Sequence, residues 1–71
     1  MEEYKTRMVK EYQELREKYQ KLHKTLVKHD AGTLEFKLNC PAELLKEQAS
    51  TMGKYLYILE ERAEIEGIEL E

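Results

Sequence analysis

The sequence has few of the residues that rigidify small domains, above all cysteines that could form disulfides. Its 71 residues include one cysteine, Cys40, one proline and three glycines, and no tryptophan. A single cysteine cannot form a disulfide within the chain, which indicates a protein that does not depend on oxidation. A chain of this length buries only about 60% of the surface that its unfolded form exposes. We therefore expect self-association to complete the core.

Long apolar runs and a strong excess of one charge are missing as well. No stretch approaches the ~20 apolar residues of a membrane-spanning helix, and the N-terminal segment is charged throughout, without the apolar core of a signal peptide. The net charge is −3. This argues against general nucleic-acid binding, which usually goes with a strongly basic pI. The sequence predicts a cytoplasmic protein that does not enter a membrane.

What the chain does contain is helical periodicity. Apolar side chains recur at alternating steps of four and three from about residue 3 to residue 29, the pattern of a helix with one buried face. Gly32 follows where a left-handed residue would end that helix. The predicted buried face consists of Met8, Tyr12, Leu15, Tyr19, Leu22 and Leu26.

A second helix is predicted from about residue 41 to residue 66. Pro41 suits its first turn, and Asn39 and Cys40 are both candidates for its N-cap. A buried, inert thiol is the expectation for Cys40. Gly53 interrupts the helix, either as a surface position without a role or because another backbone or a ligand approaches closely. The predicted buried face consists of Leu45, Met52, Tyr55, Leu56, Leu59 and Ala63, and Gly67 is the predicted terminator.

Two long helices joined by a connection over residues 30–40 predict an all-α fold, a single domain with a two-helix antiparallel hairpin. Several large apolar residues fall outside both buried faces, more than one hairpin covers. We therefore expect the hairpins to assemble into an oligomeric helical bundle, a homo-oligomer. The residues outside the buried faces are Tyr4, Val9, Val27, Leu44, Tyr57, Ile58 and Ile65.

The connection and the tail alternate apolar and polar residues, as strands do. Short β segments are predicted at 33–38 (TLEFKL) and 67–71 (GIELE). A helix of about 24 residues is about 36 Å long, so the two segments would have to pair between protomers. Alternatively, the first folds over its own hairpin end as a lid, and the second extends the helix or frays. In both cases the apolar residues of the connection should be buried. The predicted oligomer interface comprises Leu34, Phe36, Leu38, Ile58, Ile65, Ile68 and Leu70.

Catalytic and metal-binding patterns are absent from the sequence. Ser50 has no histidine at helical spacing, and His23 and His29 are six residues apart, so they lie on different faces of a helix. No spacing typical of metal ligands and no glycine-rich phosphate loop occurs. We expect neither an enzyme nor a cofactor or metal site.

Aromatic and basic side chains on the first helix predict a binding surface instead. Tyr12, Arg16, Tyr19 and His23 follow one edge of the buried face, and aromatic rings beside cationic groups suit stacked bases and phosphates. The simpler alternative is that the lysines form a solvated face and the tyrosines belong to the core. The predicted ligand-binding residues are Tyr12, Arg16, Tyr19, Lys21, His23, Lys24, Lys28 and Tyr55.

Two stretches, RMVKEYQELREKYQKLHKTL and LLKEQASTMGKYLYILEERA, resemble a family of short phage-encoded helical hairpins. Members of this family are labelled by similarity to an uncharacterised protein of a crAss-like phage. The second-helix landmarks of the family, L–Q–M–Y–L–R, fall here on Leu45, Gln48, Met52, Tyr55, Leu59 and Arg62. More distantly, the architecture is similar to phage proteins that act as oligomeric sponges for cyclic nucleotides.

The resemblance implies a non-enzymatic phage accessory protein in the cytoplasm of the host cell. Its implied role is to counter host defence by sequestering a nucleotide-type immune signal in an oligomer. The alternative is a protein–protein interaction module that inhibits a host or phage protein through its apolar helical surface.

Overall fold

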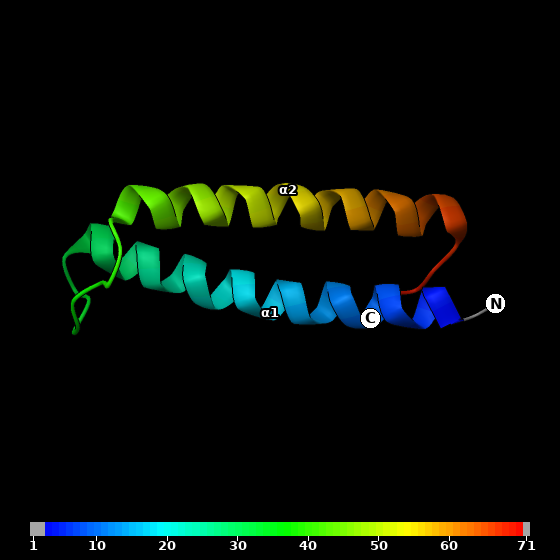
Figure 1. Cartoon of the computed structure of the whole chain (residues 1–71), viewed down its shortest axis with the longest axis horizontal. Coiled ribbons are helices and arrows are strands. Elements are labelled where there is room, and N and C mark those ends of the chain that lie inside the picture. Colours follow the sequence, from blue (N-terminus) through cyan, green and yellow to red (C-terminus); the bar gives the residue numbers. More distant parts are fainter. Residues whose placement is uncertain (1–2, 71) are drawn as a thin grey trace.

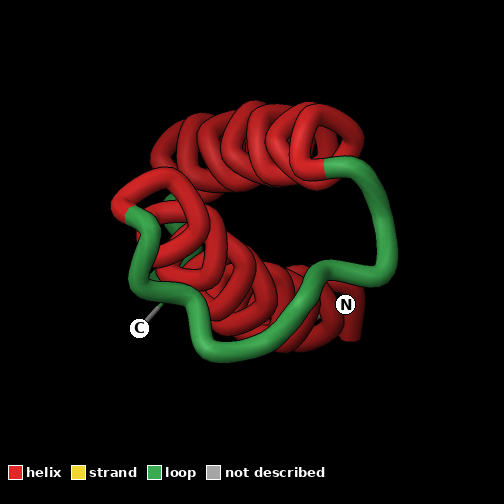
Figure 2. The backbone as a smooth tube through the Cα atoms, turned by 90° about the vertical axis from the view of Figure 1, so that its left-hand side faces the viewer, coloured by secondary structure: helices red, strands yellow, loops and turns green. Residues whose placement is uncertain are grey.

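The computed structural model describes residues 3–70, and these residues form a hairpin of two antiparallel helices (Figure 1). Helix α1 spans Glu3–Ala31 and helix α2 spans Ala42–Glu66. The molecule measures 46 × 17 × 16 Å. Seen from the end where the connection crosses, the two helices form one layer (Figure 2). The predicted all-α hairpin is confirmed.

Both helices end at a glycine with left-handed backbone geometry, as predicted. Gly32 has a φ of +79° and Gly67 a φ of +69°. The N–H of Thr33 then donates to the carbonyl of Lys28 (2.9 Å), and the N–H of Ile68 donates to the carbonyl of Ala63 (2.8 Å). Each bond reaches back five residues and satisfies a carbonyl of the last turn, the geometry that glycine adopts without steric cost.

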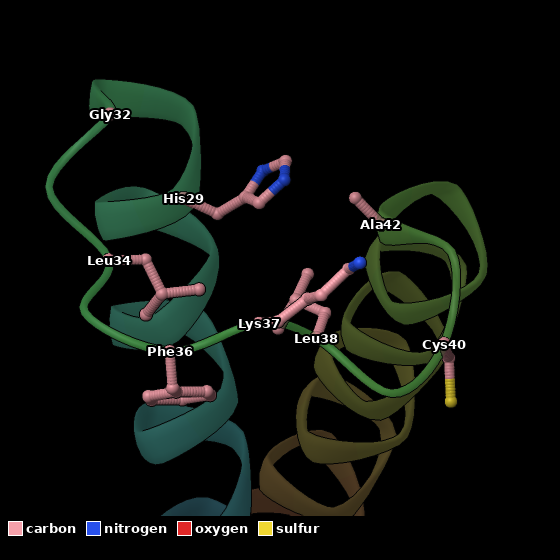
Figure 3. Close-up of a pocket in the computed structure, with 8 residues that line it drawn as sticks. All are labelled: His29, Gly32, Leu34, Phe36, Lys37, Leu38, Cys40 and Ala42. Atoms are coloured by element: carbon pink, nitrogen blue, oxygen red, sulfur yellow. The ribbon is translucent and has the colours of Figure 1, made fainter.

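The start of α2 differs from the prediction. Pro41 occupies the N-cap position with extended backbone (φ −59°, ψ 140°), and no side chain caps the helix. The predicted caps, Asn39 and Cys40, are wrong because the helix begins one residue later than expected, at Ala42, which leaves them outside the cap position. Cys40 is exposed and points away from the hairpin (Figure 3), so the expected burial of its thiol is wrong too.

The core is a single strip of side chains between the helices. Six of its seven members come from the predicted buried faces, and the seventh, Ala49, was not predicted. Tyr55, which was predicted to be buried, is exposed. Small alanines on α2 let α1 approach closely. Leu59 is the most deeply buried, with 1% of its surface exposed. The buried residues are Met8, Tyr12, Leu26, Ala49, Leu56, Leu59 and Ala63.

Three tyrosine–glutamate hydrogen bonds join the helices alongside this strip. Tyr4 donates to Glu66 (2.9 Å) and Tyr12 donates to Glu60 (2.6 Å), both from α1 to α2. A third bond, from Tyr55 of α2 to Glu11 of α1, is also 2.6 Å long. The carboxylate acceptors make these bonds charge-assisted, which strengthens them.

The tail folds back onto its own hairpin. After Gly67 the chain crosses from α2 to α1 (Figure 1), and Ile68 and Leu70 pack against the core. The side-chain amide of Gln13 donates to the carbonyl of Leu70 (3.1 Å). The predicted β segment and its alternative, a helical or frayed tail, are both wrong for residues 67–70. The left-handed turn at Gly67 directs the apolar side chains onto the open end of the core. Residue 71 lies outside the described residues.

The connection is not a strand either. Leu34 and Leu38 are half-buried, and Leu38 lies between the ends of the two helices (Figure 3). Phe36 is 62% exposed, so it is not part of a lid over its own hairpin end, and its burial between protomers stays a prediction. The end of the hairpin partly covers Leu34 and Leu38, and it leaves Phe36 exposed.

Candidate binding site

A groove runs along one edge of the hairpin, where α1 and α2 meet. The central side chain is Tyr19, which lines two adjoining hollows of about 380 and 560 Å³. These volumes fall in the range of small-molecule sites. We call this feature the Tyr19 groove and define it by Tyr19, His23, Lys46, Ala49, Ser50 and Gly53.

The groove is open because α2 presents small side chains opposite Tyr19. Ala49, Ser50 and Gly53 recur on the side of α2 that faces the ring. A Cβ atom built on Gly53 would lie 3.5 Å from Cε1 of Tyr19, which is ordinary van der Waals contact. The sequence left two explanations for Gly53, a surface position without a role or the close approach of a backbone or a ligand. The structure shows a close neighbour, but this neighbour is the side chain of Tyr19 in the same chain. The glycine is not forced by a clash, and both residues line the same hollow.

Two aromatic rings stack on α1 at this groove. The ring centroids of Tyr19 and His23 are 5.8 Å apart, and the ring planes differ by 17°. The spacing of four residues on a helix places the rings side by side on one face. Tyr19 is half-buried and His23 is exposed, so the pair presents a flat edge to the groove.

The neighbouring pair on α1 is built differently. The guanidinium carbon of Arg16 lies 5.8 Å from the ring centroid of Tyr12, a cation–π contact. Tyr12 itself is buried, and its hydroxyl is already bound to Glu60. This hydrogen bond, together with burial, raises the pKa of Tyr12 above its usual value near 10. Tyr12 therefore belongs to the core, and the half-buried Arg16 lies over its ring, one helical turn before the groove.

The charge at the groove is set by one acidic residue. Lys46 Nζ lies 3.2 Å from Oδ1 of Asp30, and Nδ1 of His29 lies 3.3 Å from the same oxygen. These hydrogen bonds, first to His29 and then to Lys46, lower the pKa of Asp30. The ionised carboxylate of Asp30 partly neutralises Lys46. An anionic ligand that binds Lys46 must therefore compete with Asp30.

The remaining predicted binding residues do not converge on the groove. Lys21 pairs with Glu17 on an exposed face (3.6 Å). Lys24 and Lys28 line a separate hollow beside the connection. Tyr55 is bound to Glu11, and this hydrogen bond raises the pKa of its hydroxyl. The structure thus brings Tyr19 and His23 together, places Tyr12 and Arg16 next along the same helix, and leaves the other four elsewhere.

The sequence reasoning missed the α2 side of the groove. The signal was present as small residues at helical spacing, Ala49, Ser50 and Gly53, beside the predicted aromatic edge of α1. A row of small residues in a helix that otherwise carries large side chains indicates a depression. Outward from Gly53, the rim continues with Lys54, Tyr57 and Ile58.

A further hollow of about 410 Å³ lies at the connection (Figure 3). His29 and Lys37 point toward it, and Leu34, Phe36 and Leu38 supply apolar walls. His29 is already engaged with Asp30. Within residues 3–70, no group of three or more His, Cys, Asp or Glu side chains is arranged to hold a metal ion. Neither helix, over these same residues, is long and apolar enough to cross a membrane.

The chain matches a known protein family over most of its length. The family model described as Sequestin matches residues 2–65. No curated protein and no solved structure matches the chain.

Proposed function

The chain belongs to the Sequestin family, and we propose that it sequesters a small nucleotide-type ligand in the Tyr19 groove, without catalysis. The family name refers to sequestration, which supports a binding function and leaves the ligand open. The observation that carries the proposal is the stacked Tyr19–His23 pair above a floor of small residues, with Lys46 at its side.

The aromatic pair suits a nucleobase. A base laid on the exposed side of the Tyr19–His23 pair would extend the stack of these two rings, which are already nearly parallel. Stacking of a base on an aromatic side chain is worth about 1–3 kcal/mol and accepts any base, because every base has a π face. Stacking in the groove would therefore select nucleotides as a class and would not by itself distinguish one base from another.

The cations beside the pair suit phosphate. Lys46 lies on the α2 side of the groove, and Arg16 is one helical turn before Tyr19 on α1, with its guanidinium over the Tyr12 ring. Phosphate binding by Lys46 requires that the ligand replace Asp30 as its partner. We expect the affinity to fall with added salt, because these groups are at the surface.

The biological role that we propose is counter-defence by a phage protein, with a nucleotide immune signal as the ligand. The resemblance of the two helices to phage-encoded hairpins supports this role. A protein that holds a signal stoichiometrically needs an accessible groove and no catalytic group, and the Tyr19 groove fits that requirement.

Isothermal titration calorimetry tests the proposal. The titrants are cyclic di-AMP, cyclic di-GMP and cyclic tri-adenylate, with AMP and ATP as linear comparisons. We expect the wild-type chain to bind at least one cyclic compound and Tyr19→Leu, which keeps apolar bulk in the groove, to bind it about tenfold or more weakly. Tyr55→Phe is the matched control and should bind as the wild type does. Silence of the folded wild type across the panel, or unchanged binding by Tyr19→Leu, would refute the proposal.

A second candidate function is inhibition of a host or phage protein. It is favoured by the exposure of Phe36, a large apolar side chain at the tip of the hairpin. If this function holds, a stoichiometric protein partner is lost with Phe36→Ser and retained with Tyr19→Leu. Retention of the partner by Phe36→Ser would exclude the tip as its docking site.

A further inference from the structure

The outer face of α2 carries an apolar stripe that no residue in the described part of the chain covers. Leu44, Ile58 and Ile65 are 55%, 49% and 79% exposed. Together with Thr51 they recur every seven residues, which places all four on one face of the helix. We call these four residues the outer stripe. The face of α2 that packs on α1 uses different residues, among them Leu56 and Leu59, so α2 has two apolar faces.

We propose that the outer stripe binds a second copy of the chain, with the two α2 helices antiparallel and Ile58 at the two-fold axis. This dimer goes beyond the proposed ligand binding and does not depend on it. The charges of the chain favour a second copy on the outer stripe. The distribution of charge along the whole hairpin bears on the orientation of this copy, and the charges beside the stripe bear on its register.

Charge is distributed unevenly along the hairpin. The half that contains the connection, residues 16–53, holds seven Lys/Arg against five Asp/Glu. The half that contains the chain ends, residues 1–15 and 54–71, holds five against ten. With Ile58 at the axis, an antiparallel partner places residues 63–66 of each negative half beside residues 50–53 of the other copy's positive half, and residues 54–62 beside the same residues of the partner. A parallel partner in register would place the two negative halves together over their whole length. Since exposed charges interact over roughly 8 Å at physiological ionic strength, neighbouring copies at contact distance are affected.

Charges beside the stripe then select the register. Lys54 and Glu61 lie on one flank of the stripe, and Tyr55 and Arg62 lie on the other. In an antiparallel two-fold pair, each flank meets the same flank of the partner. With Ile58 at the axis, Ile65 faces Thr51 of the second copy, Lys54 meets Glu61, and Tyr55 meets Arg62. Symmetry forms each contact twice.

Other registers are less favourable. If Leu44 faced Ile65, the stripe would be covered from end to end, but Lys54 would meet Lys54 and Glu47 would meet Glu61, and such like-charge contacts are unfavourable. If Thr51 lay at the axis, Ile65 would have no partner, although it is the most exposed large apolar residue of the chain's described part. The register centred on Ile58 avoids both problems and leaves Leu44 outside the contact.

This arrangement also brings the second copy near the Tyr19 groove. Lys54 and Ile58 line the outer hollow that adjoins the groove. The second copy would therefore border that hollow, while Tyr19 and His23 remain on the side of the hairpin where α1 and α2 meet.

Sedimentation velocity of the full chain, from micromolar to millimolar concentration, tests the proposal. We expect a dimer, and we expect Ile65→Glu to weaken it by at least about tenfold, because the new charge would be buried without a partner. Leu44→Glu is the matched control, since it introduces the same charge in the same stripe outside the contact, and it should leave the dimer intact. Both positions are exposed, so helix content measured by circular dichroism should stay unchanged.

Charge exchange tests the register separately. Lys54→Glu and Glu61→Lys should each weaken the dimer, and the double variant should restore it, because the pair is re-formed with its charges reversed. A monomeric wild type at all concentrations would overturn the proposal. So would an effect of Leu44→Glu as large as that of Ile65→Glu, or a double variant as weak as the single ones.

Discussion

Replacing Gly53 by alanine should make the hairpin more stable and the Tyr19 groove less able to bind. Gly53 lies inside α2 and has no left-handed backbone geometry, so alanine fits its conformation. Alanine is favoured over glycine in a helix interior by about 0.8–1 kcal/mol. The added Cβ would lie 3.5 Å from the Tyr19 ring, in ordinary contact, so no strain offsets this gain.

The expected net effect is a stabilisation of about 1 kcal/mol. For a domain of this size, that corresponds to a rise in the melting temperature of roughly 4–8 °C. Thermal unfolding followed by circular dichroism at 222 nm measures it at one fixed protein concentration, because self-association would add its own contribution. Calorimetry with a bound nucleotide should show weaker binding, since the Cβ narrows the hollow that Gly53 and Tyr19 line.

Gly67→Ala is the matched control for this prediction. Gly67 has a φ of +69°, where a Cβ costs about 1–2 kcal/mol, so the same substitution there should lower the melting temperature. If Gly53→Ala destabilised the hairpin, the placement of Tyr19 against Gly53 would be wrong. If it stabilised the hairpin and left nucleotide binding unchanged, the groove would not be the binding site.

Three further predictions concern the contacts between the helices and the tail. The raised pKa of the Tyr12 hydroxyl means that the folded state holds this proton more tightly than the unfolded state does. The resulting contribution to stability is fully present below about pH 10 and is lost as the pH rises through the folded-state pKa. Urea titrations from about pH 8 to 11 should show this loss, and Tyr12→Phe should show less of it. The pH dependence from Asp30 runs the other way, because its pKa is lowered in the folded state. Its small contribution to stability is present above the ordinary pKa near 3.8 and is lost as the pH falls through the folded-state pKa. Asp30→Asn should remove that part of the acid dependence of stability. Ile68→Ala should lower the free energy of unfolding by about 1 kcal/mol, less than the roughly 2–5 kcal/mol of a core isoleucine, because Ile68 is only half-buried where it covers its own hairpin's core. This loss should not depend on protein concentration. A loss that grew on dilution would instead mean that the tail packs on another copy.

The elements of the fold were predictable because they depend on local properties. The spacing of Met8, Tyr12 and Leu26 on α1, and of Leu56 and Leu59 on α2, follows directly from helical geometry. The terminating glycines were predictable for the same reason, since each acts within one helical turn.

The path of the tail and the connection was not predictable, because it depends on which surface is nearest in space. The alternation of Ile68 and Leu70 is compatible with a strand, yet the left-handed turn at Gly67 places both residues on the core of the same hairpin. Phe36 has the same pattern and no surface to cover it.

Half of the candidate site could be predicted in the same way. The aromatic edge of α1 was visible from spacing, and this identified Tyr19 and His23. The partners of each side chain were not visible. Only the structure assigns Tyr12 to Glu60, Tyr55 to Glu11 and Asp30 to Lys46, and these pairings separate the accessible rings from the tyrosines that hold the helices together.

The central claim is that the Tyr19 groove is the site of sequestration, and an NMR titration tests it most directly. The experiment follows the backbone amide signals of the ¹⁵N-labelled chain while the tightest-binding cyclic nucleotide of the calorimetry panel is added. We expect the largest shifts at His23, Ser50 and Gly53, and small shifts at Lys24, Lys28 and Phe36 near the connection. The claim would be contradicted by shifts concentrated at the connection, or by an unchanged spectrum with every compound of the panel.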